Sequence, residues 1–224
     1  MYVKNFMTSL PLYVNKNVAV EEAAKLMHEK NIRQLPVVDD NKLIGILTFP
    51  DIMAALPSRV SKVASKENSD LAKTLKVKDA LPPHQKVITI NENACIEEAA
   101  LIMRAYRISC LPVLDATGRL IGMCTESDIF DAFIDLLGVR SSGTRIVITT
   151  NDQVGVIADI CEIIKQFHGN ISKIGFLPKG GGSTLYQIII RLKADNVQPI
   201  IEALTVNGFQ VESSADYGNN VRIL

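Results

Sequence analysis

One seven-residue pattern occurs twice in the chain, and this repetition constrains the fold more than any other feature. The pattern is Gly, two residues, Thr, two residues and Asp, and it covers residues 45–51 and 122–128. Apolar residues after the glycine are typical of a strand end, and Thr followed three residues later by Asp is typical of a helix start. Each copy therefore predicts a strand-to-helix junction that holds polar groups at a cleft.

The similarity between the two copies extends well beyond this pattern. Residues 20–27 align with 96–103, and residues 35–37 align with 111–113, at a constant offset of about 76 residues. The offset grows by one after Asp115, because the turn 115–118 is one residue longer than the turn 39–41. An insertion confined to a turn is expected of two copies of one folded unit.

Each copy has the hydrophobic pattern of a strand, a helix, two strands and a second helix. The first helix has apolar residues at i, i+3, i+4 and i+7, at Val20, Ala23, Ala24 and Met27. Two apolar runs, 35–38 and 43–47, flank a polar turn and predict a strand pair. Pro57 should end the short helix after Asp51, Gly138 should end its longer counterpart, and residues 58–78 read as a connector.

The segment from residue 145 onward has a different pattern. It predicts strand 145–149, helix 154–167, strand 171–177, a glycine turn at 180–182, strand 184–192, helix 197–206 and strand 209–214. This β-α-β-β-α-β order is the ferredoxin-like plan, in which two helices cover one face of an antiparallel sheet.

Charge and cysteine content disfavour several functional classes. Lys and Arg number 24, as do Asp and Glu, so nothing favours nucleic acid or an acidic membrane surface as a partner. No segment is apolar for long enough to span a bilayer. The four cysteines have neither metal-ligand nor disulfide spacing, so we expect small buried residues in a reducing compartment, and a cytoplasmic protein.

The motifs of common enzymes are missing from the sequence. Residues 179–184 are glycine-rich but lack the GK[ST] ending of a phosphate loop, and the three histidines have no metal-ligand spacing. We find no nucleophile elbow, HExxH motif or paired-acid constellation. We therefore expect no enzyme, no catalytic cofactor and no metal site.

The duplicated unit resembles the tandem CBS (Bateman) module, through the Leu-Pro-Val strand and the closing Gly-x-x-Thr-x-x-Asp pattern in both copies. The resemblance implies an adenosine ligand: AMP, ATP, S-adenosylmethionine or NAD. Thr and Asp at a helix start can hydrogen-bond ribose hydroxyls, although both are also ordinary helix caps. The implied ribose contacts are Thr48, Asp51, Thr125 and Asp128, and the implied adenine contacts are Leu35, Pro36, Val87, Ile88, Leu111 and Pro112, with the strand at 12–13.

The two copies differ where a phosphate would need a cation. Arg33 precedes Leu-Pro in the first copy, whereas Ser109 and Cys110 precede it in the second. Arg33 is the better phosphate candidate, with Arg104 and Arg107 as alternatives that a solvated charged face explains almost as well. This difference disfavours a triphosphate more than an adenosyl ligand.

The C-terminal segment resembles the ACT domain, which commonly binds amino acids. Its Asp-x-x-Gly loop appears at 152–155, before a helix whose amide groups suit a carboxylate. Asp152 as a helix cap and Gly155 as a packing residue would explain the loop equally well, and many ACT units only dimerise. The implied amino-acid contacts are Asp152, Gln153, Val154, Gly155, Val156 and Asn170.

The domain order resembles that of bacterial acetoin-utilisation proteins. We expect CBS repeats at 1–60 and 77–138 around a connector at 61–76, a linker at 139–144, an ACT domain at 145–216 and a tail at 217–224. The predicted function is allosteric regulation: an adenosine nucleotide shifts the packing of the repeats, and an amino acid or a dimer contact supplies a second input. Ile52, Met53, Ile129, Phe130 and Phe133 would form a homodimer face. The alternative is a dimeric scaffold that binds a partner protein and no nucleotide.

Overall fold

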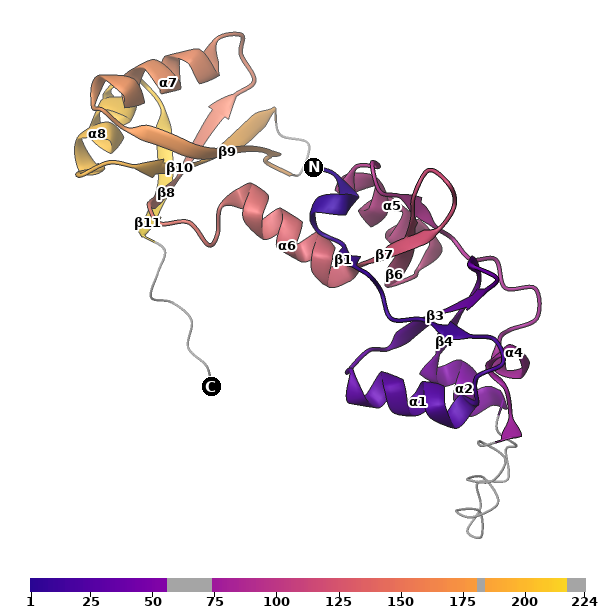
Figure 1. Cartoon of the computed structure of the whole chain (residues 1–224). Coiled ribbons are helices and arrows are strands. Elements are labelled where there is room, and N and C mark those ends of the chain that lie inside the picture. The colour runs from indigo at the N-terminus through magenta and orange to yellow at the C-terminus, as the bar shows by residue number, and fades with distance from the viewer. Residues whose placement is uncertain (56–73, 181–183, 217–224) are drawn as a thin grey trace, which may run out of the picture. The chain divides into compact units, whose positions relative to one another are not determined.

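The computed structural model describes residues 1–55, 74–180 and 184–216. These residues form two compact units, 1–132 and 133–224, which we describe separately. The first unit contains the two sequence repeats and the second contains the C-terminal segment (Figure 1). Residues 61–73 of the predicted connector 61–76 lie outside the described residues. The predicted helix end at Pro57, most of the glycine turn 180–182 and the tail 217–224 also lie outside them.

The first repeat has a three-stranded sheet with helices formed by its amphipathic segments. Its elements are β2 (Val14–Asn15), α1 (Val20–Glu29), β3 (Gln34–Asp39), β4 (Lys42–Thr48) and α2 (Phe49–Ala55). β2 runs parallel to β3, and β4 pairs antiparallel with β3 around the polar turn. The apolar residues of α1 pack with those of β3 and β4, which gives this repeat its own core around Val20, Leu35 and Leu47.

The second repeat has the same elements in the same order. They are β5 (Ile90–Asn91), α5 (Ile96–Tyr106), β6 (Cys110–Leu114), β7 (Leu120–Thr125) and α6 (Glu126–Leu137). Its sheet gains a fourth strand, β1 (Thr8–Ser9), which comes from the N-terminus and pairs antiparallel with β7. The predicted strand-helix-strand-strand-helix order is therefore confirmed in both copies.

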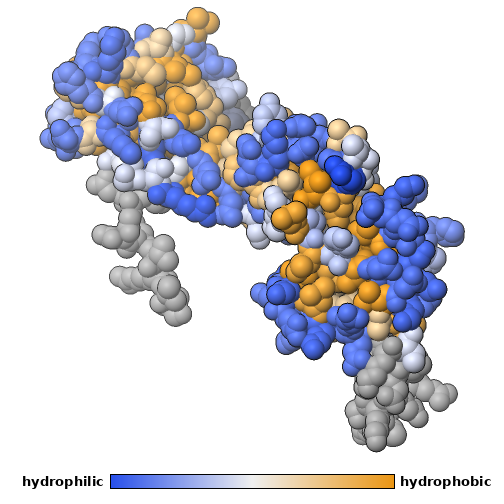
Figure 2. Space-filling view, viewed as in Figure 1, coloured by the Kyte–Doolittle hydropathy of each residue, from blue (hydrophilic) through white to orange (hydrophobic). Residues whose placement is uncertain are grey.

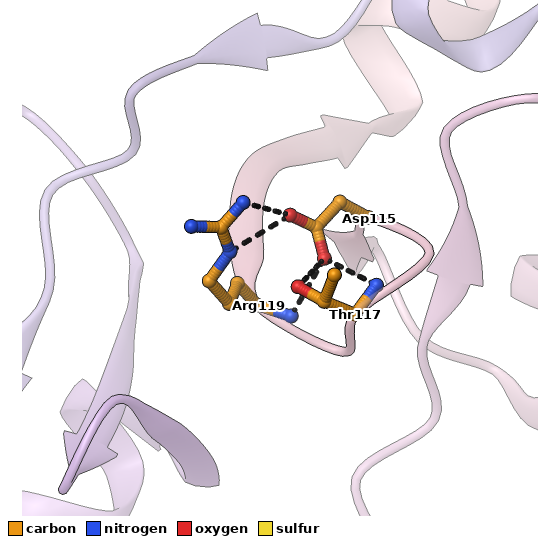
Figure 3. Close-up of polar contacts among 3 residues, drawn as sticks. All are labelled: Asp115, Thr117 and Arg119. Atoms are coloured by element: carbon orange, nitrogen blue, oxygen red, sulfur yellow. Dashed lines mark hydrogen bonds and ion pairs between the residues drawn. The ribbon is translucent and has the colours of Figure 1, made fainter.

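The turn that is one residue longer in the second copy is held by one carboxylate (Figure 3). Asp115 accepts hydrogen bonds from the Thr117 hydroxyl at 2.6 Å and from the Arg119 Nε at 3.0 Å. The backbone amides of Thr117 and Arg119 also donate to it. The Thr117 hydroxyl bond, followed by the Arg119 amide, lowers the pKa of Asp115 well below its usual value. The inserted residue is thus accommodated by a compact, charge-assisted turn.

Each repeat is completed by the segment that leads into the other repeat. Val3, at the start of the short helix η1 (Val3–Asn5), is fully buried in the core of the second repeat, and its amide donates to the carbonyl of Ala94. Val77, at the start of α4 (Val77–Ala80), is fully buried in the core of the first repeat, and its amide donates to the carbonyl of Val18. The two repeats therefore exchange equivalent segments and fold as one module.

The second unit has the predicted β-α-β-β-α-β order. Its elements are β8 (Thr144–Asn151), α7 (Val156–Gln166), β9 (Asn170–Pro178), β10 (Leu185–Lys193), α8 (Gln198–Val206) and β11 (Gln210–Asp216). The sheet order is β11-β8-β10-β9, and every pair is antiparallel. Residues from α7 and α8 share one core with the inward side chains of β8 and β10, among them Ile148, Ile160, Ile190 and Ile200.

The structure corrects two expectations about exposure. Ile52 and Ile129 are 3% and 8% exposed and belong to the cores of the repeats, so they are not available for a dimer face. Cys95 is exposed at the start of α5, whereas Cys110 and Cys124 are buried as expected. No helix within the described ranges combines the length and the apolar character needed to cross a membrane.

Candidate functional site

The repeated Thr and Asp form the same hydrogen-bonded pair at both strand-to-helix junctions. Asp51 Oδ2 accepts the backbone amide of Thr48 at 2.8 Å and its hydroxyl at 2.5 Å, and Thr48 Oγ1 accepts the amide of Asp51 at 3.3 Å. At the second junction the corresponding distances between Thr125 and Asp128 are 2.7, 2.8 and 3.4 Å. The helix-capping role considered from the sequence is therefore present in both copies.

The larger of the two related clefts lies between the repeats, beside Thr125. Its volume is about 480 Å³. From the first repeat it is lined by the segment 10–12, by Arg33 and by Pro36, and from the second by Thr125 and the adjoining start of α6. It therefore combines an apolar wall, one cation, one carboxylate and several hydroxyl groups. Its lining also includes Gln34, Ser109, Cys110, Met123, Glu126 and Ser127.

The smaller cleft lies beside Thr48 and has a volume of about 140 Å³. It is lined by the segment 85–88, which leads into the second repeat, and by Ile46 and Thr48 of the first repeat. Val87 and Ile88, predicted from the sequence, are part of this lining. Lys86 supplies a cation that the sequence pattern did not indicate, because its position at this cleft depends on the exchange of segments between the repeats.

The two clefts occupy corresponding positions in the two repeats, and each is lined by residues of both repeats. Thr125 faces the cleft formed with the segment 10–12 and Pro36, whereas Thr48 faces the cleft formed with the segment 85–88. The sequence predicted the residue types but not this crossed pairing, because the pairing depends on how the repeats pack.

Several predicted contacts lie behind the cleft walls. Asp51 and Asp128 hold the threonines in place and are not among the cleft-lining residues. Leu35 and Leu111 are fully buried in the cores and are not among the residues that line either cleft. Pro112 pairs with Met123 inside the sheet of the second repeat.

The alternative cations, Arg104 and Arg107, line a third cavity of about 610 Å³ on the second repeat. They share it with Glu126, which also borders the larger cleft. Gln34 borders all three cavities and donates from Nε2 to the Ser109 hydroxyl at 3.0 Å. Gln34 is therefore a shared wall residue that the sequence pattern did not indicate.

The two buried cysteines of the second repeat, Cys110 in the cleft walls and Cys124 in the core, are poor nucleophiles. Burial raises the pKa of Cys110 to about 12, and burial with the nearby Asp128 raises the pKa of Cys124 to about 12. Both thiols therefore stay protonated at neutral pH and act as small wall and core residues. No cluster of His, Cys, Asp and Glu suited to a metal ion occurs within the described part of the chain.

The predicted amino-acid loop in the second unit is open to solvent. Gly155 precedes α7 with a φ of +91°, and its Cβ position is free of neighbouring atoms within 4 Å. Asp152, Gln153 and Val154 are exposed, and Asn170 begins β9. The structure brings Asp152 to Gly155 together at the start of α7, whereas Val156 is 9% exposed and belongs to the core of the second unit, so its side chain is not available as the predicted amino-acid contact.

The fold and the paired clefts define the first unit as a module of two packed, equivalent α/β repeats with one cleft for each repeat. The CBS domain model matches residues 3–58 and 77–135, about half of the chain, and the chain belongs to this family. A CBS domain-containing protein of Dictyostelium discoideum is 35% identical over 60% of this chain and 92% of its own length. Longer relatives include the homoserine O-acetyltransferase of Methanococcus vannielii. It is 38% identical over 57% of this chain, and the match covers 24% of its own length.

Two solved structures are similar to the first unit. A chain described as a "putative acetoin utilization protein (AcuB)" from Vibrio cholerae is 31% identical over 62% of this chain and 95% of its own, with a TM-score of 0.51. A CBS domain pair crystallised with 5′-methylthioadenosine and S-adenosyl-L-methionine is 32% identical over 59% of this chain and 95% of its own, with a TM-score of 0.48.

Proposed function

We propose that the chain is a regulatory sensor that binds an adenosine-containing ligand in the clefts of its CBS module. The observation that carries this proposal is the larger cleft beside Thr125, which places a hydroxyl, the start of α6, an apolar wall and Arg33 around one space. Ribose hydroxyls would meet Thr125 and the adjoining polar residues, the base would meet Pro36 and Leu12, and an anionic group would meet Arg33.

The charge of the larger cleft favours a ligand with little net charge. One cation, Arg33, and one carboxylate, Glu126, line it, so a triphosphate would face a like charge without a second cation. A monophosphate or an adenosyl sulfonium fits this balance better. AMP and S-adenosylmethionine are therefore our preferred ligands over ATP and NAD.

Titration calorimetry with AMP and S-adenosylmethionine tests this proposal on the full chain. We expect Thr125→Val to weaken binding at least about tenfold, because one good hydrogen bond contributes about 1 kcal/mol and its unpaired partner costs more. Thr150→Val, in the second unit, is the matched control and should bind as the original chain does. Equal affinity in Thr125→Val and the control would contradict the assignment of this cleft.

A second input at the C-terminal unit belongs to the same proposal. Its β-α-β-β-α-β order and the left-handed Gly155 before α7 support an ACT domain that binds an amino acid at 152–155 and Asn170. Melting curves with single amino acids at millimolar concentration test this role. A stabilising amino acid whose effect is lost in Gly155→Val would support it, and a flat response to the whole panel would contradict it.

The alternative function is a dimeric scaffold with empty clefts. Exposed apolar side chains favour it, since Met53 and Phe130 of the first unit are 49% and 67% exposed and Phe133 is 40% exposed. Light scattering of the original chain and of Phe130→Ser distinguishes the cases. A dimer that Phe130→Ser dissociates, in a chain that binds no adenosine compound, would favour the scaffold.

Similarity to the Vibrio cholerae protein supports a role in acetoin utilisation. Deleting the gene in its source organism and following acetoin consumption tests this role. Slower consumption, restored by the intact gene, is the expected result, and unchanged consumption would contradict it.

A further inference from the structure

The smaller cleft differs from the larger one in how its entering segment is attached to the sheet. In the second repeat the main chain of Thr8 and Ser9 pairs with Met123 and Gly122 as strand β1. In the first repeat, one side chain occupies the edge of β4 that corresponds to the edge of β7 paired with β1. Gln85 Oε1 accepts the Ile46 amide at 2.8 Å, and Gln85 Nε2 donates to the Ile46 carbonyl at 3.0 Å.

The sequence explains why a side chain replaces the strand. In both repeats a proline lies opposite this position, Pro36 opposite Ile46 and Pro112 opposite Met123, and proline has no amide hydrogen, so the peptide groups of Ile46 and Met123 serve the other edge. The difference between the repeats therefore comes from the segment at that edge. At that edge the segment reads Leu-Pro-Pro-His-Gln over residues 81–85, where the N-terminal segment has Met-Thr-Ser-Leu-Pro over residues 7–11. Pro82 and Pro83 cannot donate to β4, whereas Thr8 and Ser9 can pair with β7.

The turn that presents Gln85 is closely defined. His84 has a φ of +59°, matching the φ of +53° at Leu10 in the other segment, and the Gln85 amide donates to the Pro82 carbonyl at 3.2 Å. Gly45 makes room for this arrangement, since a Cβ there would lie 2.8 Å from Leu81 Cδ1 and 3.1 Å from Gln85 Oε1.

The hydrogen-bonding pattern at Ile46 matches one edge of adenine. A carboxamide and the edge of adenine that carries the 6-amino group both present a donor beside an acceptor, and each can therefore satisfy a peptide N–H and C=O side by side. Gln85 borders the smaller cleft, so the groups that it occupies are at the wall of that cleft. In the larger cleft the corresponding peptide groups are paired with the main chain of β1, which a ligand could displace only by moving the whole strand.

We propose that Gln85 is an internal substitute for the base in the smaller cleft, so that an adenine-bearing ligand enters there only by displacing its carboxamide. This inference rests on the proposed function. It makes the two clefts unequal: the larger one fills first, and the smaller one binds more weakly because only chains with Gln85 displaced can accept the base. The apparent dissociation constant of a site rises in inverse proportion to the fraction of chains in which it is open.

Titration calorimetry of the full chain with AMP, and separately with S-adenosylmethionine, tests the inference. We expect the original chain to bind one ligand tightly and a second at least about tenfold more weakly. Gln85→Ala should strengthen the second site about tenfold and leave the first unchanged. Gln85→Glu, which loses the donor to the Ile46 carbonyl, should act in the same direction and guards against a folding defect in the alanine variant. His84→Asn, which keeps a residue that tolerates positive φ, is the matched control and should behave as the original chain does.

Purine riboside 5′-monophosphate provides a second test, because it lacks the 6-amino donor. It should bind in the larger cleft as AMP does. At the smaller cleft it should bind weakly both to the original chain and to Gln85→Ala, because it cannot donate to the Ile46 carbonyl. Two equal sites in the original chain, or one site unaffected by both Gln85 variants, would overturn the inference and leave the proposed function standing. If neither AMP nor S-adenosylmethionine binds to the original chain or to any variant, the proposed function is contradicted, and the inference with it.

Discussion

Gly45 and Gly122 lie where another segment of the chain crosses the edge of a sheet. A Cβ at Gly45 would meet the Leu81 side chain at 2.8 Å, and a Cβ at Gly122 would overlap with the Sδ atom of Met7. The glycine of the repeated pattern therefore permits each repeat to receive the segment that completes it. This role could not be predicted from the pattern itself, since it depends on a contact between residues far apart in the sequence.

Substituting Gly45 by alanine should destabilise the first unit. The added methyl group would push the side-chain ends of Leu81 and Gln85 from their positions, and because both side chains are flexible we expect a cost of about 1 kcal/mol, the low end for overpacking. Urea unfolding measures the change. Gly180→Ala is the control, because its Cβ position is free within 4 Å, and an equal effect in the two variants would contradict the packing role of Gly45.

Asp115 should contribute to stability in a pH-dependent way. Its hydrogen bonds to Thr117 and Arg119 lower its pKa in the folded state below the unfolded value, so its contribution is present above the unfolded pKa and is lost as the pH falls through the folded pKa. We expect the stability difference between the original chain and Asp115→Asn to be constant above about pH 5 and to shrink below it. Urea unfolding from pH 7 to pH 3 measures it, and a difference independent of pH would contradict this role.

At the scale of the elements, the strand-to-helix junctions were predicted well and the cleft walls less so. The Thr-Asp pattern predicted two capped helix starts, and both have the same reciprocal hydrogen bonds. Local hydrogen bonds follow from local sequence, which is why this prediction succeeded. Gln85 and Lys86 were missed because their positions depend on the exchange of segments between the repeats.

Asp128→Ala should destabilise α6 even without any ligand. Removing the carboxylate leaves the Thr125 amide and hydroxyl without their acceptor, and the loss of a helix cap costs about 0.5–2 kcal/mol. Urea unfolding of the ligand-free protein gives the cost. Glu126→Ala changes the neighbouring exposed residue and serves as the control. If Asp128→Ala is no less stable than this control, the capping role is wrong.

At the scale of the whole molecule, the chain joins one duplicated module to one sheet-and-helix unit. The internal repeat predicted the duplication, and the β-α-β-β-α-β pattern predicted the C-terminal topology, because both follow from hydrophobic periodicity. The inequality of the two clefts was not predicted, although its cause is visible in the sequence as Pro82-Pro83 in place of Thr8-Ser9. Clefts of different affinity would fill over different ranges of ligand concentration, which would widen the range over which the proposed sensor responds.

The most direct test of the central claim is thermal melting of the purified full chain with AMP, ATP, S-adenosylmethionine and NAD in turn. A ligand at about one hundred times its dissociation constant stabilises the folded state by about 2.7 kcal/mol, which raises the midpoint by several degrees. We predict such a rise with AMP or S-adenosylmethionine and a reduced rise in Thr125→Val. An unchanged midpoint with all four compounds, in protein shown to be folded and free of bound nucleotide, would contradict the claim that the CBS module is an adenosine sensor.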